Sequence, residues 1–374
     1  MADFDIIIAG AGVVGLALAK ELSAAGKFVL VVEKHPSFGN EISSRNSEVV
    51  HSGIYYEKDS LKAKLCVEGR KLLYKWCLES GVPFNKTGKY IIAVNRDEES
   101  RLYMLLKKGL DNGVEGLKIV NSNVVMDANT GINCVSALYS PESGIVDSHL
   151  LMESFLTKSK EFDCQYVFNH EVTKVSRSNG SYITTLKDTT GVTYEVSSDY
   201  FINSAGLGAD LIAESAGIDI DRYGYRITYC KGHYFKLRTG LNGIAKNLIY
   251  PVPLVNFTGL GVHITLDLSG GLKLGPDVLY LDDREQNYYV PDLLQQKFYE
   301  SAKRYIPNLS YDDLSPDQSG IRPKLQRKGE PVRDFIINEE SSKGLPRFIN
   351  LIGIESPGLT SCLAIANYVK RSLL

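Results

Sequence analysis

Three glycines near the start of the chain have the spacing of a dinucleotide site. Residues 10–15 read GAGVVG, a G-x-G-x-x-G pattern between an apolar stretch and a helical one. Gly10 permits a tight turn, Gly12 lets a pyrophosphate approach the backbone, and Gly15 lets helix and strand pack closely. Glu33 ends the next apolar stretch, where its carboxylate can accept hydrogen bonds from ribose hydroxyls and repel a 2′-phosphate.

The glycine pattern by itself does not decide between FAD and NAD. A polar stretch, Ser43–Ser47 (SSRNS), follows soon after Glu33. Its hydroxyls, amide and guanidinium have the chemistry to hold the far phosphate and the start of a flavin. The same composition is typical of an ordinary solvated loop, so both interpretations stay open at this point.

Bulk composition argues against several classes of function. The chain has 42 basic and 44 acidic residues, a net charge of −2, and so lacks the basic excess of a nucleic-acid-binding protein. Its six cysteines are scattered without a C-x-x-C pair, which argues against a disulfide framework or a structural zinc site.

No apolar run approaches the ~20 residues of a transmembrane helix. A strand expected from Asp5 leaves no room for a signal peptide, so we expect a cytoplasmic protein.

The elements around the glycine pattern form a strand–turn–helix–strand unit. We predict a strand at Asp5–Ala9, a helix at Val13–Ala25 and a strand at Phe28–Glu33. Short, continuous apolar strands around a helix are typical of a parallel sheet that is buried on both faces. Apolar periodicity predicts further helices at Ser60–Ser80, Glu98–Asn112, Asp147–Phe162 and Ser361–Ser372.

Strand patterns dominate the middle of the chain. Gly88–Val94 and Ala137–Tyr139 are predicted strands. Residues 220–315 are rich in Tyr, Gly and Pro and have period-two stretches at His233–Leu237 and Gly261–Leu266, which predicts an antiparallel sheet that faces substrate. An antiparallel meander, followed by one more strand, is predicted at Cys164–Phe168, Glu171–Val175, Tyr182–Leu186, Tyr194–Val196 and then Tyr200–Asn203.

Motifs of one enzyme family occur along essentially the whole chain. They are His51–Tyr56 (HSGIYY), Ser60–Cys66 (SLKAKLC), Gly88-Lys89, Gly144–Asp147 (GIVD), Asn203–Gly206 (NSAG), Tyr250–Pro253 (YPVP), Gly259–Thr265 (GLGVHIT), Gly271–Asp277 (GLKLGPD), Gly320–Pro323 (GIRP) and Ile354–Thr360 (IESPGLT). In these motifs the sequence resembles the L-2-hydroxyglutarate dehydrogenase/oxidase group of the D-amino-acid-oxidase-like FAD proteins. The resemblance, more than the glycine pattern, implies that the cofactor is FAD.

The resemblance and the alternation of elements predict an α/β fold. A Rossmann-like FAD-binding domain is interrupted by an antiparallel α+β substrate domain. We expect the FAD-binding domain to comprise residues 1–82, 143–218 and 316–374, and the substrate domain to comprise residues 83–142 and 219–315.

The resemblance also implies which residues contact FAD. Backbone N–H groups after Gly358, together with the N-terminus of the last helix, would stabilise negative charge on the reduced flavin. The full predicted set is Gly10, Gly12, Val13, Val14, Gly15, Glu33, Lys34, Ser44, Arg45, Asn46, Ser47, His51, Ser52, Gly53, Val172, Ala205, Gly206, Arg322, Pro357, Gly358, Leu359 and Thr360.

Two of the six histidines are candidate general bases, because an imidazole has a pKa suited to proton transfer near neutrality. The resemblance puts the loop of His51 against the flavin, where His51 is a base, an orienting partner, a covalent attachment point for FAD, or a core histidine bonded to backbone. His263 lies beside Gly259 and Gly261, which would let a ligand or a flavin ring approach closely. We expect no catalytic role for His35, His149 and His170.

Substrate carboxylates require cations. Arg322 is the first candidate, because a guanidinium can bind a carboxylate through two parallel hydrogen bonds. Lys231 and Tyr250 are second candidates, and exposed surface charge is the alternative interpretation of Arg322 and Lys231. A dicarboxylate would need Arg322 and a second cation. Lys231 and His233 depart from the arginine and the acidic residue typical of the mitochondrial members, which favours a bacterial-type branch.

These residues predict FAD-dependent oxidation of a small, anionic 2-hydroxy acid to the 2-oxo acid, with L-2-hydroxyglutarate as the leading substrate. The resemblance implies that a hydride passes from the α-carbon to flavin N5 while a base takes the hydroxyl proton. Alternatives on the same fold are oxidation of an amino acid or of glycerol 3-phosphate, and a non-catalytic flavin-binding redox sensor. Oxygen, a quinone and a partner protein all stay open as the electron acceptor.

Overall fold

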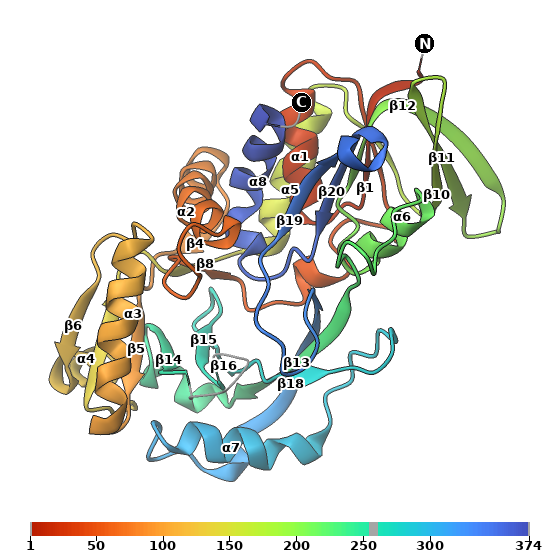
Figure 1. Ribbon diagram of the computed structural model, residues 1–374. Coiled ribbons are helices and arrows are strands. Elements are labelled where there is room, and N and C mark those ends of the chain that lie inside the picture. The colour runs from red at the N-terminus through yellow and green to blue at the C-terminus, as the bar shows by residue number, and fades with distance from the viewer. Residues whose placement is uncertain (1, 254–260, 373–374) are drawn as a thin grey trace. The chain divides into compact units, whose positions relative to one another are not determined.

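The chain folds into two compact units (Figure 1). A computed structural model describes residues 2–253 and 261–372. The first unit comprises residues 1–44, 148–229 and 322–374, and the second comprises residues 45–147 and 230–321. Two long strands, β13 (Thr228–Leu237) and β18 (Leu314–Lys324), run from one unit into the other.

The first unit contains a sheet and four helices. The helices are α1 (Val13–Ser23), α5 (Ser148–Lys160), α6 (Ala209–Ser215) and α8 (Gly358–Ser372). The strands are β1 (Phe4–Ala9), β2 (Val29–Val32), β9 (Gln165–Val167), β10 (His170–Ser178), β11 (Ser181–Asp188), β12 (Thr193–Asn203), β19 (Ile336–Glu340) and β20 (Leu345–Ile352).

A parallel core explains the continuous apolar strands of the first unit. β1 pairs in parallel with β2 and β12, β2 pairs in parallel with β9, and β12 pairs in parallel with β20. Every residue of β2 is buried, as expected for a strand covered on both faces. Helix α1 packs against α5 and α8, and the three helices lie side by side in Figure 1. The predicted strand–helix–strand opening is therefore confirmed.

Two details of the predicted meander are wrong. Strands β10, β11 and β12 are antiparallel, but Cys164–Phe168 contains β9, which pairs in parallel with β2. The segments Tyr194–Val196 and Tyr200–Asn203 belong to one strand, β12, which pairs with β11 along its first half and with β1 along its second. The polar residues between them do not end the strand, because Ser197 bonds to Asp3 and Ser198 donates to the carbonyl of Tyr200.

The second unit is built on a larger sheet, with strand order β17-β13-β16-β15-β14-β5-β7-β6, and a small sheet, β3-β8-β4. Its helices are α2 (Leu61–Ser80), α3 (Glu99–Asp111), α4 (Ser122–Ala128) and α7 (Gln295–Lys303). Its other strands are β3 (Val49–Val50), β4 (Phe84–Asn85), β5 (Lys89–Ala93), β6 (Lys118–Asn121), β7 (Ser136–Ser140), β8 (Gly144–Val146), β14 (Leu248–Pro251), β15 (Ile264–Leu266), β16 (Leu272–Leu274) and β17 (Leu279–Tyr280).

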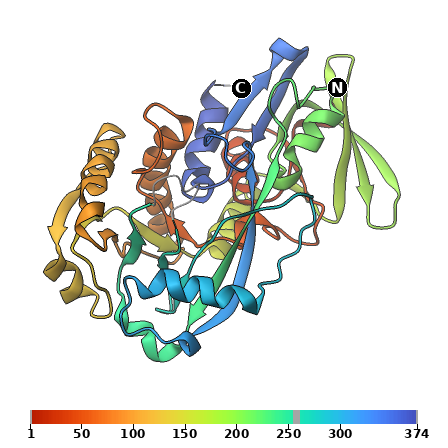
Figure 2. The ribbon, with the colours of Figure 1, turned by 60° about the horizontal axis from the view of Figure 1, so that its bottom comes forward.

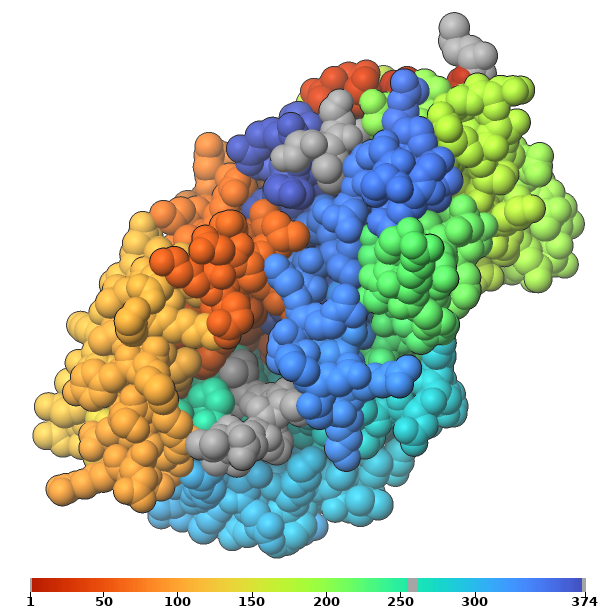
Figure 3. Space-filling view, in the orientation of Figure 1, coloured from red at the N-terminus to blue at the C-terminus, as the bar shows by residue number. Residues whose placement is uncertain are grey.

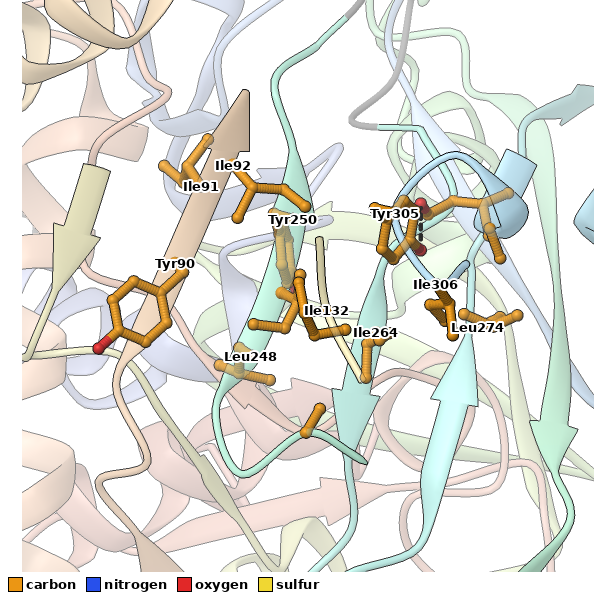
Figure 4. Packing of buried hydrophobic residues seen from close by; sticks show 14 of the residues in the cluster. Tyr90, Ile91, Ile92, Ile132, Leu248, Tyr250, Ile264, Leu274, Tyr305 and Ile306 are labelled. Atoms are coloured by element: carbon orange, nitrogen blue, oxygen red, sulfur yellow. Dashed lines mark hydrogen bonds between the residues drawn. The ribbon is translucent and has the colours of Figure 1, made fainter. Parts of the chain in front are cut away.

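The antiparallel prediction for residues 220–315 is confirmed, with one exception. β13, β15 and β16 pair antiparallel, whereas β14 pairs in parallel with β5. Helix α7 packs against β13 through Phe298 and Phe235, whose ring centroids are 4.6 Å apart (Figures 1 and 2). Figure 4 shows part of the core, in which Tyr250 and Leu248 lie on β14 and Tyr305 donates to the carbonyl of Val262 (3.1 Å).

The predicted helices at the start of the second unit are confirmed. The hydroxyl of Ser60 accepts from the N–H of Ala63 and begins α2, and Gly81 ends it in the left-handed conformation. Helix α3 buries Leu102 and Gly109 and otherwise lies at the surface of its unit (Figure 3). Within the described residues, no helix is both long and apolar enough to cross a membrane.

The compact units differ from the predicted domains chiefly at residues 45–82. We expected this segment in the FAD-binding domain, but β3 pairs with β8, so the segment belongs to the second unit. The compact units reflect packing and do not test which segments bind FAD, so the predicted domain bounds stay a prediction. All six cysteines are buried and none of them forms a disulfide.

Aromatic packing stabilises the parallel sheet, and its removal is testable. Phe348 is fully buried and stacks on Phe201 (ring centroids 5.1 Å apart), with Tyr182 edge-on at 5.6 Å. We expect Phe348→Ala to lower the free energy of unfolding by about 3–5 kcal/mol, measured by urea unfolding with circular dichroism. Val332→Ala, at a side chain that is 64% exposed, is the control and should cost less than about 0.5 kcal/mol. Equal losses for both variants would contradict this packing role.

Candidate active site

The glycine pattern forms a turn with no room for side chains. A Cβ atom added at Gly15 would lie 2.0 Å from the carbonyl oxygen of Gly10, and one added at Gly10 would lie 2.8 Å from the carbonyl oxygen of Ser204. Gly12 is the N-cap of α1 and has no side chain to cap it, the hydroxyl of Ser43 accepts from the N–H of Val13 (3.0 Å), and the first turn contains no acidic residue. The N–H groups and positive dipole end of α1 are thus arranged for an anionic group.

The other predicted cofactor residues of the first unit lie at the same edge of the sheet. Ala9 lies opposite Val32 and Asn203, and Asn203 lies opposite Asn350, so the carboxyl ends of β1, β2, β12 and β20 are aligned. Nucleotides bind at this edge in open α/β sheets. The segments that follow these strands contain Gly10, Gly12, Val13, Val14 and Gly15, then Glu33 and Lys34, then Ala205 and Gly206, and finally Pro357, Gly358, Leu359 and Thr360.

Glu33 is held in place by backbone donors. Its carboxylate accepts from the N–H of Ala11 (2.8 Å) and from the N–H of His35 (2.9 Å). Lys34 pairs with Glu41 (2.7 Å), and the charge of Glu41 raises the pKa of Lys34 although burial acts in the opposite direction. Glu33 is therefore fixed beside the glycine turn, where the dinucleotide pattern requires a ribose-binding carboxylate.

Helix α8 begins three residues earlier than predicted, at Gly358. Its N-terminus therefore coincides with the predicted flavin contacts Gly358–Thr360, which places a positive dipole end at those residues. Just before the helix, Glu355 forms a buried ion pair with Lys324 (2.6 Å). The sequence did not reveal this pair, which fixes the loop between β20 and α8.

Of the remaining predicted cofactor residues, Ser44 lies close to that edge, since its neighbour Ser43 accepts from the N–H of Val13 (3.0 Å) and Gly39 donates to the carbonyl of Ala11 (3.0 Å). Val172 lies on β10, next to an irregularity in its pairing with β11. Ser44 donates to the carbonyl of Gly39. In the second unit, the guanidinium of Arg45 lies 4.0 Å above the ring of Tyr288. Asn46, Ser47, His51, Ser52 and Gly53 also belong to the second unit. Their contacts with FAD stay predictions.

The second unit brings together two predicted catalytic residues on one face of its sheet. Ile249 pairs with Ile264, which makes Tyr250 and His263 neighbours, and their rings stack with centroids 3.7 Å apart. Both residues are buried. His263 Nδ1 bonds to the carbonyl of Gly261 (2.9 Å), which requires a proton on Nδ1 and leaves Nε2 as the basic nitrogen. Gly259 lies outside the described residues.

His51 belongs to the same group of side chains. It follows β3, and burial lowers its pKa well below the usual value, with further lowering by the charges of Lys89 and His263. The imidazole of His51 is therefore neutral, and able to accept a proton, at neutral pH. The structure thus places His51, Tyr250 and His263 together.

The two residues predicted to bind substrate carboxylates as cations, Lys231 and Arg322, have different surroundings. Lys231 Nζ donates to the carbonyl of Tyr289 (2.7 Å), and burial lowers its pKa. Arg322 is half-buried and belongs to the first unit. The neighbouring His233 donates to Asp277 (2.9 Å), which also accepts from Lys297 (2.8 Å). Burial would raise the pKa of Asp277, but these bonds outweigh it and lower the pKa to about 2.

Sequence reasoning missed Lys89 and Tyr55. Lys89 begins β5, is 1% exposed, and lies with its Nζ 4.0 Å from the ring centroid of Tyr250 and 5.8 Å from that of Tyr55. Burial lowers the pKa of Lys89 to about 7. The signal was a charged residue at the head of a fully apolar strand, KYIIA, inside a motif that the family resemblance had marked.

FAD fits the first unit. The carboxyl edge of the sheet carries the glycine turn, the N-terminus of α1, a fixed carboxylate and the N-terminus of α8. Gly10 and Gly15 let the backbone of the turn pack closely enough to bring the N-terminus of α1 to this edge, as the dinucleotide pattern requires. Among the described residues no cluster of metal-ligating side chains occurs.

Comparison with known proteins agrees with this arrangement. The model of the FAD dependent oxidoreductase family (DAO) matches residues 5–371. The mitochondrial L-2-hydroxyglutarate dehydrogenase of Arabidopsis thaliana is 40% identical, in a match that covers 99% of this chain and 83% of that protein. The Homo sapiens enzyme of the same name is 32% identical, with coverages of 98% and 88%.

A bacterial relative and two solved structures extend the comparison. The L-2-hydroxyglutarate dehydrogenase of Indibacter alkaliphilus is 30% identical over 98% of each chain, so the predicted bacterial-type branch gains no support. The FAD-bound L-alpha-glycerophosphate oxidase of Mycoplasma pneumoniae is 27% identical, with a TM-score of 0.86 and coverages of 99% and 94%. Glycine oxidase of Geobacillus kaustophilus has the same fold, with a TM-score of 0.81 at 16% identity and coverages of 99% and 94%.

The glycine turn predicts a specific defect in cofactor binding. A Cβ at position 12 would lie 3.0 Å from Ser43 Oγ, on the backbone that a pyrophosphate approaches. We expect Gly12→Ala to weaken FAD binding at least about tenfold, measured by titrating the apoprotein with FAD. Gly240→Ala is the control, because a Cβ there meets nothing within 4 Å. An unchanged FAD affinity in Gly12→Ala would place the cofactor elsewhere.

Proposed function

The chain belongs to the FAD dependent oxidoreductase family and to its L-2-hydroxyglutarate dehydrogenase group, and on this basis we propose that it oxidises L-2-hydroxyglutarate to 2-oxoglutarate. The names of its relatives support this substrate. The observation that carries the chemistry is the buried group of His51, Tyr250 and His263 beside a lysine. Such a group combines a neutral base with cationic and phenolic donors, which an acidic alcohol substrate requires.

In the proposed reaction the alcohol loses a hydride and a proton. FAD, when bound, would supply the acceptor for the hydride that leaves the α-carbon. His51 takes the hydroxyl proton, since its pKa is lowered and its ring is neutral. His263 is the alternative base, because Nδ1 is bonded to a carbonyl and Nε2 is basic. Arg322 supplies a guanidinium suited to one substrate carboxylate.

Two further points stay open to experiment: the electron acceptor and the location of the protein in the cell. Oxygen, a quinone and a partner protein are the acceptors to be compared. The cytoplasmic location expected from the sequence stays a prediction, since the relatives from Arabidopsis thaliana and Homo sapiens are named mitochondrial.

Anaerobic reduction of the bound flavin tests the substrate. We expect L-2-hydroxyglutarate to bleach the flavin absorbance rapidly, while D-2-hydroxyglutarate, amino acids and glycerol 3-phosphate do not. Glycerol 3-phosphate belongs in the panel because the Mycoplasma pneumoniae structure is a glycerophosphate oxidase. Bleaching by another compound would replace the substrate. Stable FAD that no compound reduces would favour the redox-sensor alternative.

Replacement of His51 tests the base. We expect His51→Gln to slow flavin reduction by L-2-hydroxyglutarate about 10²–10⁴-fold, the usual contribution of a general base, as measured by anaerobic stopped flow. His149→Gln, at an exposed histidine on α5, should reduce at the wild-type rate. A rate near wild type in His51→Gln, together with a slow His263→Gln, would assign the base to His263.

The pH dependence of the same step follows from the lowered pKa of His51. The base form of His51 is complete above its pKa and is lost by protonation below it. At saturating substrate, the flavin-reduction rate should therefore stay constant between about pH 6.5 and 8 and should fall only at lower pH. A rate that declines steadily as the pH is lowered from about 8 to 6.5 would be inconsistent with a buried neutral imidazole as the base.

A further inference from the structure

Lys89 is a buried cation without a carboxylate partner. In the parallel pairing of β5 with β14, Lys89 lies opposite Leu248 and Ile91 lies opposite Tyr250. Alternation of side chains therefore puts Lys89 and Tyr250 on the same face, and Lys89 Nζ lies 4.0 Å from the ring centroid of Tyr250. Within the described part of the chain, the ammonium forms no ion pair and no hydrogen bond.

Three other buried lysines each have an ion-pair or hydrogen-bond partner. Lys324 pairs with Glu355 (2.6 Å), Lys20 pairs with Glu21 (2.6 Å), and Lys231 donates to a backbone carbonyl. Burial of an ammonium without such a partner is costly, and a cation–π contact offsets only about 2 kcal/mol of that cost. Lys89 is at least as deeply buried as these lysines, but the described groups near it are aromatic rings, phenolic hydroxyls and the thiol of Cys66, and none of them is a carboxylate.

Two phenolic hydroxyls beside Lys89 also lack partners. The hydroxyls of Tyr55 and Tyr250 are buried and make no hydrogen bond with any described residue. Burial raises the pKa of both tyrosines, so both hydroxyls are protonated donors at neutral pH. An ammonium and two phenols together match the acceptor oxygens of a carboxylate.

We propose that Lys89, assisted by Tyr55 and Tyr250, binds the substrate carboxylate remote from the reacting carbon and so selects a dicarboxylic acid. The inference rests on the proposed function. Every 2-hydroxy acid has the carboxylate next to the reacting carbon, so selection of a five-carbon dicarboxylate requires a cation for the second, remote carboxylate. Among the described buried lysines of the second unit, Lys231 is engaged with Tyr289 and Lys62 also has interactions of its own, so Lys89 is the lysine suited to that role.

Removal of the charge at position 89 should weaken binding of the remote carboxylate and leave binding of the carboxylate next to the reacting carbon nearly unchanged. We expect Lys89→Met to lower kcat/KM for L-2-hydroxyglutarate about 10- to 150-fold, the range for a hydrogen-bonded charge. L-2-hydroxybutyrate, which lacks the remote carboxylate, should lose less than about threefold. Lys118→Met is the matched control: Lys118 is exposed and lies over the ring of Tyr139 at 5.6 Å. Equal losses for both acids in Lys89→Met would overturn the assignment.

A binding measurement keeps this inference distinct from the proposed function. Glutarate has both carboxylates but no hydroxyl to oxidise. Its affinity for the FAD-loaded protein, measured by calorimetry, should fall about 10- to 150-fold in Lys89→Met and stay at the wild-type value in Lys118→Met. If L-2-hydroxyglutarate reduces the flavin while Lys89→Met binds glutarate normally, only the role of Lys89 fails. If no hydroxy acid reduces the flavin, the proposed function fails, and glutarate binding still decides the role of Lys89.

The wild-type protein and a charge-retaining variant test the inference even where Lys89→Met does not fold. The titratable groups that face Lys89 are His51, Cys66, Tyr55 and Tyr250, with His263 and Tyr234 beyond them. Burial lowers the pKa of Lys89 to about 7, so the glutarate dissociation constant should rise up to about tenfold per pH unit above that value. Lys89→Arg, whose guanidinium stays charged, should remove this dependence. The same dependence in Lys89→Arg would overturn the inference.

Discussion

The close approach of Gly15 to the carbonyl of Gly10 is the constraint on which the first unit depends. Because a Cβ at Gly15 would lie 2.0 Å from that oxygen, only glycine lets α1 begin directly over the end of β1. The N-terminus of α1 then points along the carboxyl edge of the sheet, and Glu33 bonds back to the N–H of Ala11. Van der Waals contact, rather than any single hydrogen bond, thus sets the position of an anion-binding helix end.

Buried polar side chains keep the neighbouring strands in register with that edge. Asn203 donates to Asn350 (2.7 Å), and Asn350 donates to Glu340 (2.8 Å), which connects β12, β20 and β19. Tyr225 also donates to Glu340 (2.8 Å). A shift in register would leave these buried groups without partners, which costs more than their bonds contribute. The loops after β12 and β20 therefore stay aligned with the glycine turn.

Local patterns in the sequence predicted the parts of this protein that local forces decide. The strand–helix–strand opening, the cap of α2 at Ser60 and the apolar face of α3 follow from spacing and side-chain type. Pairing between distant segments was not predictable in this way: β9 has a strand pattern, but nothing in its residues tells that it joins β2. The same limit hid Lys89. Its strand was recognised, whereas its position beside Tyr250 depends on the parallel pairing of β5 with β14, about 160 residues away along the chain.

The arrangement around Lys89 couples substrate binding to base strength. The charge of Lys89 is one reason why the pKa of His51 is lowered. Burial is the larger reason and keeps the imidazole neutral, and the charge of Lys89 makes His51 a still weaker base. In the proposed complex a carboxylate at Lys89 offsets the charge and removes that part of the lowering, while burial still holds the pKa of His51 below its usual value. A monocarboxylate leaves Lys89 uncompensated and His51 weak. The lysine therefore acts on specificity twice, through contact with the second carboxylate and through the field at the base.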